Sequence, residues 1–185
     1  GEGPKNPQIQ KYIDIEKRIA QTIKKQIQFT KDYHEIGVQS PQWYNVKKTI
    51  ETATAPLPLP LGTLTVGIEN ISIYADPLLE KVFYNLVENA LRYGRKLTRI
   101  TFSSRLSGDS ITLVCEDNGD GVPEEFKEAI FKRQYFKHTC FGLFLSREIL
   151  GITGLSIRES GEPGKGARFE ITVPPGYFQI EDQAG

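Results

Sequence analysis

The sequence predicts a two-layer α/β sandwich, in which a mixed, largely antiparallel sheet is covered on one face by helices, and one long helix precedes the sandwich. Strand-like segments with alternating apolar residues and helix-like segments with a 3.6-residue period follow one another in mixed order. Several strands are joined by turns too short to carry the helix that a parallel neighbour requires. A sandwich with hairpins therefore fits this order better than a doubly wound parallel sheet.

The first predicted element is one long helix, because no proline or glycine stands between Pro7 and Gly37. Its apolar band is wide enough to contact neighbours on two sides, which favours membership of an antiparallel helical bundle. Packing against its own domain stays open as the alternative. Gly37 and Pro41 end the helix. The heptad positions are Tyr12, Ile15, Ile19, Thr22, Gln26, Phe29, Tyr33 and Ile36, and the adjoining stripe holds Ile9, Ile13, Ile23 and Ile27.

The next segments predict a short helix, a connector, two strands and a longer helix. Asp76 is expected to cap the longer helix and Pro77 to open it, and Gly94 ends it. The predicted ranges are a helix over residues 45–55, an extended connector over 56–62, and two short strands within 64–75 around a turn at residues 69–70.

The C-terminal half predicts a hairpin, a helix and a closing strand pair. The hairpin strands cover residues 99–106 and 110–116, a short acidic helix begins at 123, an irregular segment follows at 132–142, a helix covers 143–151, and the last strands cover 156–159 and 167–173.

Composition gives no sign of a nucleic-acid partner, since 23 basic and 23 acidic residues balance among 185. The two cysteines, Cys115 and Cys140, and the two histidines fit neither a disulfide framework nor a metal cluster, so we expect a cytoplasmic domain. No apolar run reaches the roughly 18–20 residues of a membrane span. Anchoring of a longer parent protein in a membrane stays open.

The helix around "YNLVENALRYG" carries a polar face that its apolar stripe does not require. Asn85, Glu88, Asn89 and Arg92 stand at positions i, i+3, i+4 and i+7, so two amides, a carboxylate and a guanidinium line one side of the helix. Further along follow "EDNGDGVP" directly after a strand, "FGLFLSREIL" at a helix start, and "GKGARFEITVP" at the last strand. Each of these motifs alone is typical of an ordinary turn or helix. Their order and spacing together are specific.

This ordered set resembles the catalytic ATP-binding domain of sensor histidine kinases, which is built on the Bergerat fold shared with DNA gyrase. The resemblance covers residues 43–174, where the four motifs match the N box, the two glycine boxes and the closing strand pair. The preceding helix resembles the second helix of the dimerisation and phosphoacceptor hairpin, especially that of archaeal kinases. The resemblance implies a hairpin helix over residues 1–40, a catalytic domain over 41–178 and a C-terminal tail over 179–185.

The resemblance implies ATP and Mg²⁺ as cofactors, and it assigns roles to individual residues. The amide oxygen of Asn89 would bind Mg²⁺. Asn85 would contact the same ion or its water as the catalytic residue, and its amide cannot act as a base toward water. Asp117 would accept a hydrogen bond from the amino group of adenine. The expected ATP-binding residues are Asn85, Asn89, Arg92, Tyr93, Asp117, Gly119, Gly121, Val122, Lys137, Thr139, Cys140, Phe141, Gly142, Leu143 and Thr172.

Glu88 is expected to form a salt bridge at the edge of the site rather than to take part in catalysis. Thr172 would supply the hydroxyl that shares a water with Asp117. Lys137 and Arg133 could reach the phosphates, although solvated charges on the lid are the simpler interpretation.

The lid between the two glycine boxes departs from the pattern of the family. No glycine stands between Gly121 and Gly142, and Cys140, Gln134 and Phe136 occupy places where relatives carry glycine. A lid without glycine is stiffer and brings its amides less close to phosphates. We expect weakened ATP affinity or a lid docked in a different way.

The acceptor of the phosphoryl group is not expected within this sequence. His34 is followed by the acidic Glu35, as in acceptor motifs, but it stands at the end of the helix that resembles the second one of the hairpin. The expected partners are the acceptor helix, a response regulator and, through the heptad helix, a second copy of the chain. Two alternatives stay open: an ATP hydrolase of the same fold, which Asn85 disfavours, and a non-catalytic module, which the unusual lid keeps in question.

Overall fold

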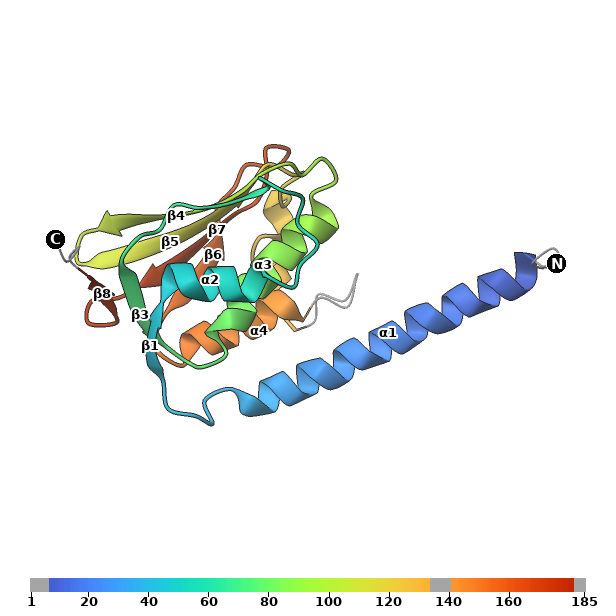
Figure 1. The fold of residues 1–185 in the computed structure, drawn as a ribbon, viewed down its shortest axis with the longest axis horizontal. Coiled ribbons are helices and arrows are strands. Elements are labelled where there is room, and N and C mark those ends of the chain that lie inside the picture. Colours follow the sequence, from blue (N-terminus) through green and yellow to red (C-terminus); the bar gives the residue numbers. More distant parts are fainter. Residues whose placement is uncertain (1–6, 134–140, 182–185) are drawn as a thin grey trace. The chain divides into compact units, whose positions relative to one another are not determined.

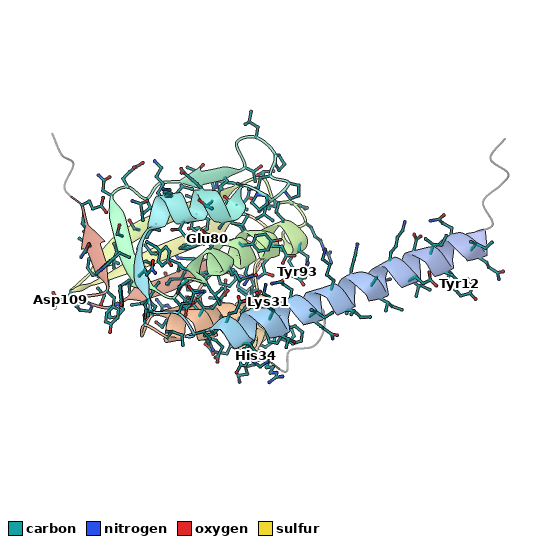
Figure 2. The ribbon with its side chains drawn as sticks, turned by 60° about the horizontal axis from the view of Figure 1, so that its bottom comes forward. Tyr12, Lys31, His34, Glu80, Tyr93 and Asp109 are labelled. Atoms are coloured by element: carbon teal, nitrogen blue, oxygen red, sulfur yellow. The ribbon has the colours of Figure 1, made fainter. Side chains whose placement is uncertain are left out.

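The computed structural model describes residues 7–133 and 141–181, and the chain divides into two compact units, Gly1–Glu35 and Ile36–Gly185. The described part of the first unit is the helix α1 (Pro7–Glu35), which confirms the predicted long helix. Figure 2 shows Tyr12 toward its N-terminal end and His34 in its last turn. Its large apolar side chains are exposed, which is typical of a surface that binds a partner: Ile9, Tyr12, Ile13, Ile15, Ile19, Ile23, Ile27 and Tyr33.

The second unit is the predicted sandwich of sheets and helices. Its five-stranded sheet has the order β2-β4-β5-β7-β6, in which only β2 and β4 pair in parallel. Figure 1 shows α2, α3 and α4 together on one side of this sheet. The strands are β2 (Leu64–Val66), β4 (Ile100–Ser107), β5 (Ser110–Asp117), β6 (Ser156–Glu159) and β7 (Arg168–Val173), and the helices are α2 (Val46–Thr54), α3 (Leu79–Tyr93) and α4 (Gly142–Gly151).

A second sheet of three strands completes the unit, in the order β1 (Gln42–Asn45), β3 (Ile71–Ala75) and β8 (Phe178–Ile180). The sequence did not predict β1 or β8, which have four and three residues. The two predicted strands within residues 64–75 form, but they join different sheets. Strand β8 also takes up the first residues of the expected tail.

The β4–β5 hairpin forms as predicted, and Asp109 marks its tip in Figure 2. Two short 3-10 turns, Glu124–Phe126 and Ala129–Phe131, replace the acidic helix start. No helix within residues 7–133 and 141–181 is both long and apolar enough to cross a membrane.

The apolar stripe of α3 fixes this helix against the sheet. The rings of Phe83 on α3 and Phe102 on β4 pack edge to face, and their centroids lie 5.8 Å apart. Burial of each such side chain stabilises the fold by about 1.5–3 kcal/mol. The buried residues of the stripe are Leu79, Val82, Phe83, Leu86, Val87 and Ala90. With this side held, the opposite side of α3 presents its polar residues in a fixed direction.

Helix α3 begins three residues after Asp76, later than the sequence predicts. The carboxylate of Asp76 accepts hydrogen bonds from the backbone N–H of Leu78, at 2.8 Å, and from that of Gly37, at 2.9 Å. The N–H of Leu79 donates to the Asp76 carbonyl. Asp76 therefore forms a turn ahead of the helix, instead of the cap on its first residue.

Candidate nucleotide-binding site

A cavity of about 250 Å³ lies between α3, the loop after β5 and the start of β7. Its lining is mostly apolar, and Asn89, Tyr93 and Asp117 supply the side-chain polar groups. An apolar cavity with a few polar groups is typical of sites for small ligands. The lining residues are Asn89, Ala90, Tyr93, Gly94, Asp117, Gly121, Val122, Pro123, Phe126, Ile130, Leu143, Ala167 and Phe169.

Asp117 is the last residue of β5, and only 9% of it is exposed. Its Oδ1 accepts hydrogen bonds from the backbone N–H of Gly119, at 2.8 Å, and of Ala167, at 3.2 Å. Among the residues that the structure describes, nothing donates to Oδ2. The carboxylate is therefore fixed through one oxygen, and the other remains for a ligand.

Burial raises the pKa of Asp117 above its ordinary value, and the charge of Glu116 adds to this. The two N–H groups from Gly119 and Ala167 lower the same pKa and offset part of the increase. A proton on this carboxyl would remove an acceptor, so the acceptor is lost as the pH falls through the raised pKa. As the pH falls, the Asp117 carboxylate therefore begins to lose its free acceptor at a higher pH than an exposed aspartate would.

Two pairs of close backbone contacts at glycines shape the site. A Cβ at Gly119 would lie 2.5 Å from the Cα of Gly94, so these glycines let the end of α3 touch the loop after β5. A Cβ at Gly166, where φ is +117°, would lie 1.9 Å from the carbonyl oxygen of Asp117. Only glycine fits at position 166.

Asn89 points its amide at the cavity from α3. It is 9% exposed, and its Nδ2 is buried without a hydrogen-bond partner among the described residues. A half-turn of the amide exchanges its nitrogen and oxygen, so the side chain can present either atom to the cavity. A buried amide with an unused polar atom is suited to a ligand that supplies the missing interaction.

Asn85 lies one turn earlier on α3 and bridges to α4. Its Nδ2 donates to the carbonyl oxygen of Gly142, at 3.0 Å, and to Oγ of Ser146, at 3.2 Å. Asn89 lines the cavity and Asn85 does not. The two amides therefore do not form the cavity wall together. Its amide nitrogen holds the start of α4 against α3.

Arg92 and Tyr93 are the last residues of α3, and Tyr93 lines the cavity. Arg92 forms an ion pair with Glu88, as expected, and its guanidinium carbon lies 6.0 Å from the centre of the Tyr93 ring. Figure 2 shows Tyr93 at the end of α3, and its side chain lines the cavity. Arg92 is thus positioned beside the site, where a cation can attract phosphate.

Part of the expected lid lies outside the described residues, namely Lys137, Thr139 and Cys140, together with Gln134 and Phe136. Phe141 directly precedes α4, and Gly142 is the first residue of that helix. Leu143 is buried and lines the cavity. The second glycine box therefore reaches the site through the first turn of α4.

Thr172 is not brought to the site, contrary to the expectation. It pairs with Thr112, five residues before Asp117 on β5, which corresponds to about 17 Å along the strand. The residue at the entry to β7 that reaches Asp117 is Ala167, which has no hydroxyl.

The sequence also missed several groups of the cavity wall: Ala90, Gly94, Pro123, Phe126, Ile130, Ala167 and Phe169. Most of them stand within the motifs quoted above, whereas Phe126 and Ile130 stand outside them. Gly166, which contacts Asp117, had a signal in the sequence as the second glycine of "GKG".

Residues 75–177 match the profile of the family described as histidine kinase-, DNA gyrase B- and HSP90-like ATPases. The match covers more than half of the chain, and the chain belongs to this family. ATP is therefore the cofactor that the domain binds.

Relatives of known function are sensor kinases. The chain is 34% identical over 117 residues to the alginate biosynthesis sensor protein KinB of Pseudomonas aeruginosa, which covers 60% of this chain and 20% of KinB. It is 34% identical over 112 residues to the adaptive-response sensory kinase SasA of Crocosphaera subtropica, which covers 55% of this chain and 29% of SasA. The matched domain is homologous to the catalytic domains of sensor histidine kinases, and it spans less than a third of these two relatives.

Solved structures of histidine kinases share the fold. Full-length ShkA in complex with AMPPNP superimposes with a TM-score of 0.68 at 15% identity, covering 97% of this chain and 41% of ShkA. The histidine kinase AdeS of Acinetobacter baumannii has a TM-score of 0.66 at 17% identity, covering 94% of this chain and 87% of AdeS. The catalytic domain of ThkA has a TM-score of 0.63 at 21% identity, covering 74% of this chain and 96% of the ThkA domain.

Proposed function

We propose that the domain binds Mg²⁺-ATP in the cavity beside Asp117 and delivers the γ-phosphoryl group to a histidine, from which it passes to a response regulator. The observation that carries this proposal is the buried carboxylate of Asp117 in an otherwise apolar cavity. Its Oδ2 would accept from the exocyclic amine of adenine. Guanine carries a carbonyl at that position and would leave the buried carboxylate unpaired, which costs affinity.

The phosphate end of the nucleotide would lie toward Asn89, Arg92 and Tyr93, at the end of α3. Asn89 fits an Mg²⁺ ligand if its amide makes a half-turn, because the atom without a partner among the described residues is Nδ2, and the half-turn puts the amide oxygen in its place. No cluster of three His, Cys, Asp or Glu within residues 7–133 and 141–181 could hold a metal. Bound Mg²⁺ would draw its other ligands from phosphate and water, and it would offset the charge of the phosphates.

The proposed transfer needs positioning rather than a base. A histidine nitrogen attacks the γ-phosphorus, the bond to the β–γ bridging oxygen breaks, ADP leaves, and a ring proton passes to solvent. Asn85 cannot take a proton from water, so this position lacks the group that would favour hydrolysis. Its contact with Gly142 and Ser146 instead holds α4, whose residue Leu143 closes the cavity.

Replacement of Asn89 with alanine is expected to lower the Mg²⁺-dependent affinity for ATP roughly tenfold, while affinity for adenosine stays unchanged. The change removes the proposed metal ligand but not Asp117. Calorimetric titrations with and without Mg²⁺ measure both quantities. Glu80→Gln, on an exposed part of the same helix (Figure 2), is the matched control. Equal loss of adenosine binding would contradict the assignment.

The transfer itself is tested with a chain extended to include the histidine-bearing hairpin that sensor kinases carry. With γ-labelled ATP, we expect label on that hairpin that is labile in acid and stable in base, and little free phosphate. The same incubation with Asp117→Asn should give no label. Release of free phosphate over many turnovers, without labelled protein, would instead indicate an ATP hydrolase.

A further inference from the structure

Glu159 and Lys127 form a largely buried ion pair, and neither residue lines the cavity. Glu159 ends β6, and its side chain is 0% exposed. Its Oε1 accepts from the backbone N–H of Gly161, at 2.9 Å, and of Arg168, at 3.1 Å. Nζ of Lys127 lies 3.7 Å from its Oε2 and donates to the carbonyl oxygen of Gly161, at 2.7 Å. The pair therefore holds Gly161 at both of its backbone polar groups.

The same pair reaches the peptide group that contacts Asp117. The peptide group between Ala167 and Arg168 forms a hydrogen bond on each side. Its N–H, on Arg168, donates to Glu159. Its carbonyl oxygen, on Ala167, accepts from the backbone N–H of Asp117 at 3.0 Å. The next N–H upstream, that of Ala167, donates to Oδ1 of Asp117. Fixing one side of this peptide plane fixes its other side, because the peptide unit is planar.

Lys127 connects this arrangement to a second segment of the cavity wall. It directly follows Phe126, which lines the cavity, and it also pairs with Glu124 at 2.7 Å. The segment that carries Phe126 and the turn that carries Gly166 are thus tied together at one buried charge pair.

We propose that Glu159 and Lys127 are positioning residues for nucleotide binding, which hold the turn at residues 160–166 so that Ala167 orients the carboxylate of Asp117. This inference rests on the proposed function for its consequence in nucleotide affinity. The turn contains three glycines and has few side chains to pack, so backbone hydrogen bonds must supply its order. A buried ion pair adds little net stability, whereas it can fix the geometry of the groups around it.

The test replaces the pair and measures the titration of Asp117 directly. Glu159→Gln keeps the size of the side chain and removes its charge, and Lys127→Met removes the other partner. Glu162→Gln is the control, because Glu162 forms an exposed ion pair with Lys165 in the same turn. We expect affinity for a non-hydrolysable ATP analogue to fall roughly tenfold in both pair variants and to stay unchanged in the control.

Carboxyl-carbon NMR titration of Asp117, without nucleotide, supplies a readout that a loss of stability alone would not move. Weaker donation from Ala167 should raise the pKa of Asp117 further. If Glu159→Gln fails to fold, the test is made with Lys127→Met. Lys127→Arg, which keeps the charge, should have the native nucleotide affinity and the native pKa of Asp117.

Nucleotide binding and the positioning of Asp117 can fail independently. A shifted Asp117 titration in a protein that binds no nucleotide would refute the proposed function and leave the positioning role standing. An unshifted titration in folded variants would overturn the positioning role, whatever the nucleotide affinity.

Discussion

Asp117→Asn is expected to lower the affinity for ATP analogues roughly a hundredfold, or about 3 kcal/mol. Oδ1 of residue 117 is held by the N–H groups of Gly119 and Ala167, so the amide nitrogen must take the place of Oδ2. That nitrogen is a donor, and it would face the amine of adenine, which is also a donor. The buried base then loses its partner and meets an unfavourable contact.

The stability of this variant should be close to that of the native protein. The acceptor for Gly119 and Ala167 is retained, and a buried carboxylate with a raised pKa is replaced by a neutral group. Asp120→Asn is the matched control, since Asp120 lies in the same loop but half of its side chain is exposed. Native affinity in Asp117→Asn, or equal losses in both variants, would contradict the adenine assignment.

Gly166→Ala is expected to destabilise the domain by about 3 kcal/mol or more and to abolish nucleotide binding. The added Cβ would lie 1.9 Å from the backbone oxygen of Asp117, and φ at this position is +117°. A backbone atom cannot move aside as a flexible side chain can, so the turn must leave Asp117. Urea unfolding measures the stability, and calorimetry measures the binding.

Gly164→Ala separates strain from collision in the same turn. Gly164 also has a positive φ, of +84°, but no atom of the described residues outside its immediate neighbours lies within 4 Å of the place that a Cβ would take. We expect a loss of about 1–2 kcal/mol, as for a left-handed alanine, with nucleotide affinity retained. Similar effects at positions 164 and 166 would show that the contact with Asp117 does not matter.

The sequence predicts the parts of the site that lie in regular elements. Asn89 is predictable because its spacing on α3 places it on the polar face beside a buried apolar stripe, and α3 has the length to show that period. Asp117 is predictable because a turn of small residues follows a strongly apolar strand. Both signals are local, and the structure places both residues at one cavity.

The remaining groups depend on register and on irregular segments. Thr172 has the expected hydroxyl, but the pairing of β5 with β7 carries it away from Asp117 and brings Ala167 there instead. Phe126 and Ile130 belong to short turns that have no period. The ion pair of Glu159 and Lys127 joins two segments that are distant in the sequence, and no local pattern indicates such a contact.

The role of Asp117 in adenine recognition is tested by the binding of a non-hydrolysable ATP analogue to the native chain, measured by calorimetry with Mg²⁺ and compared with that of the guanine counterpart. We expect a dissociation constant on the order of micromolar for the adenine nucleotide and binding at least roughly tenfold weaker for the guanine nucleotide. Equal affinity for the two bases, or no binding by a folded protein, would contradict the assignment of Asp117 as the group that recognises adenine.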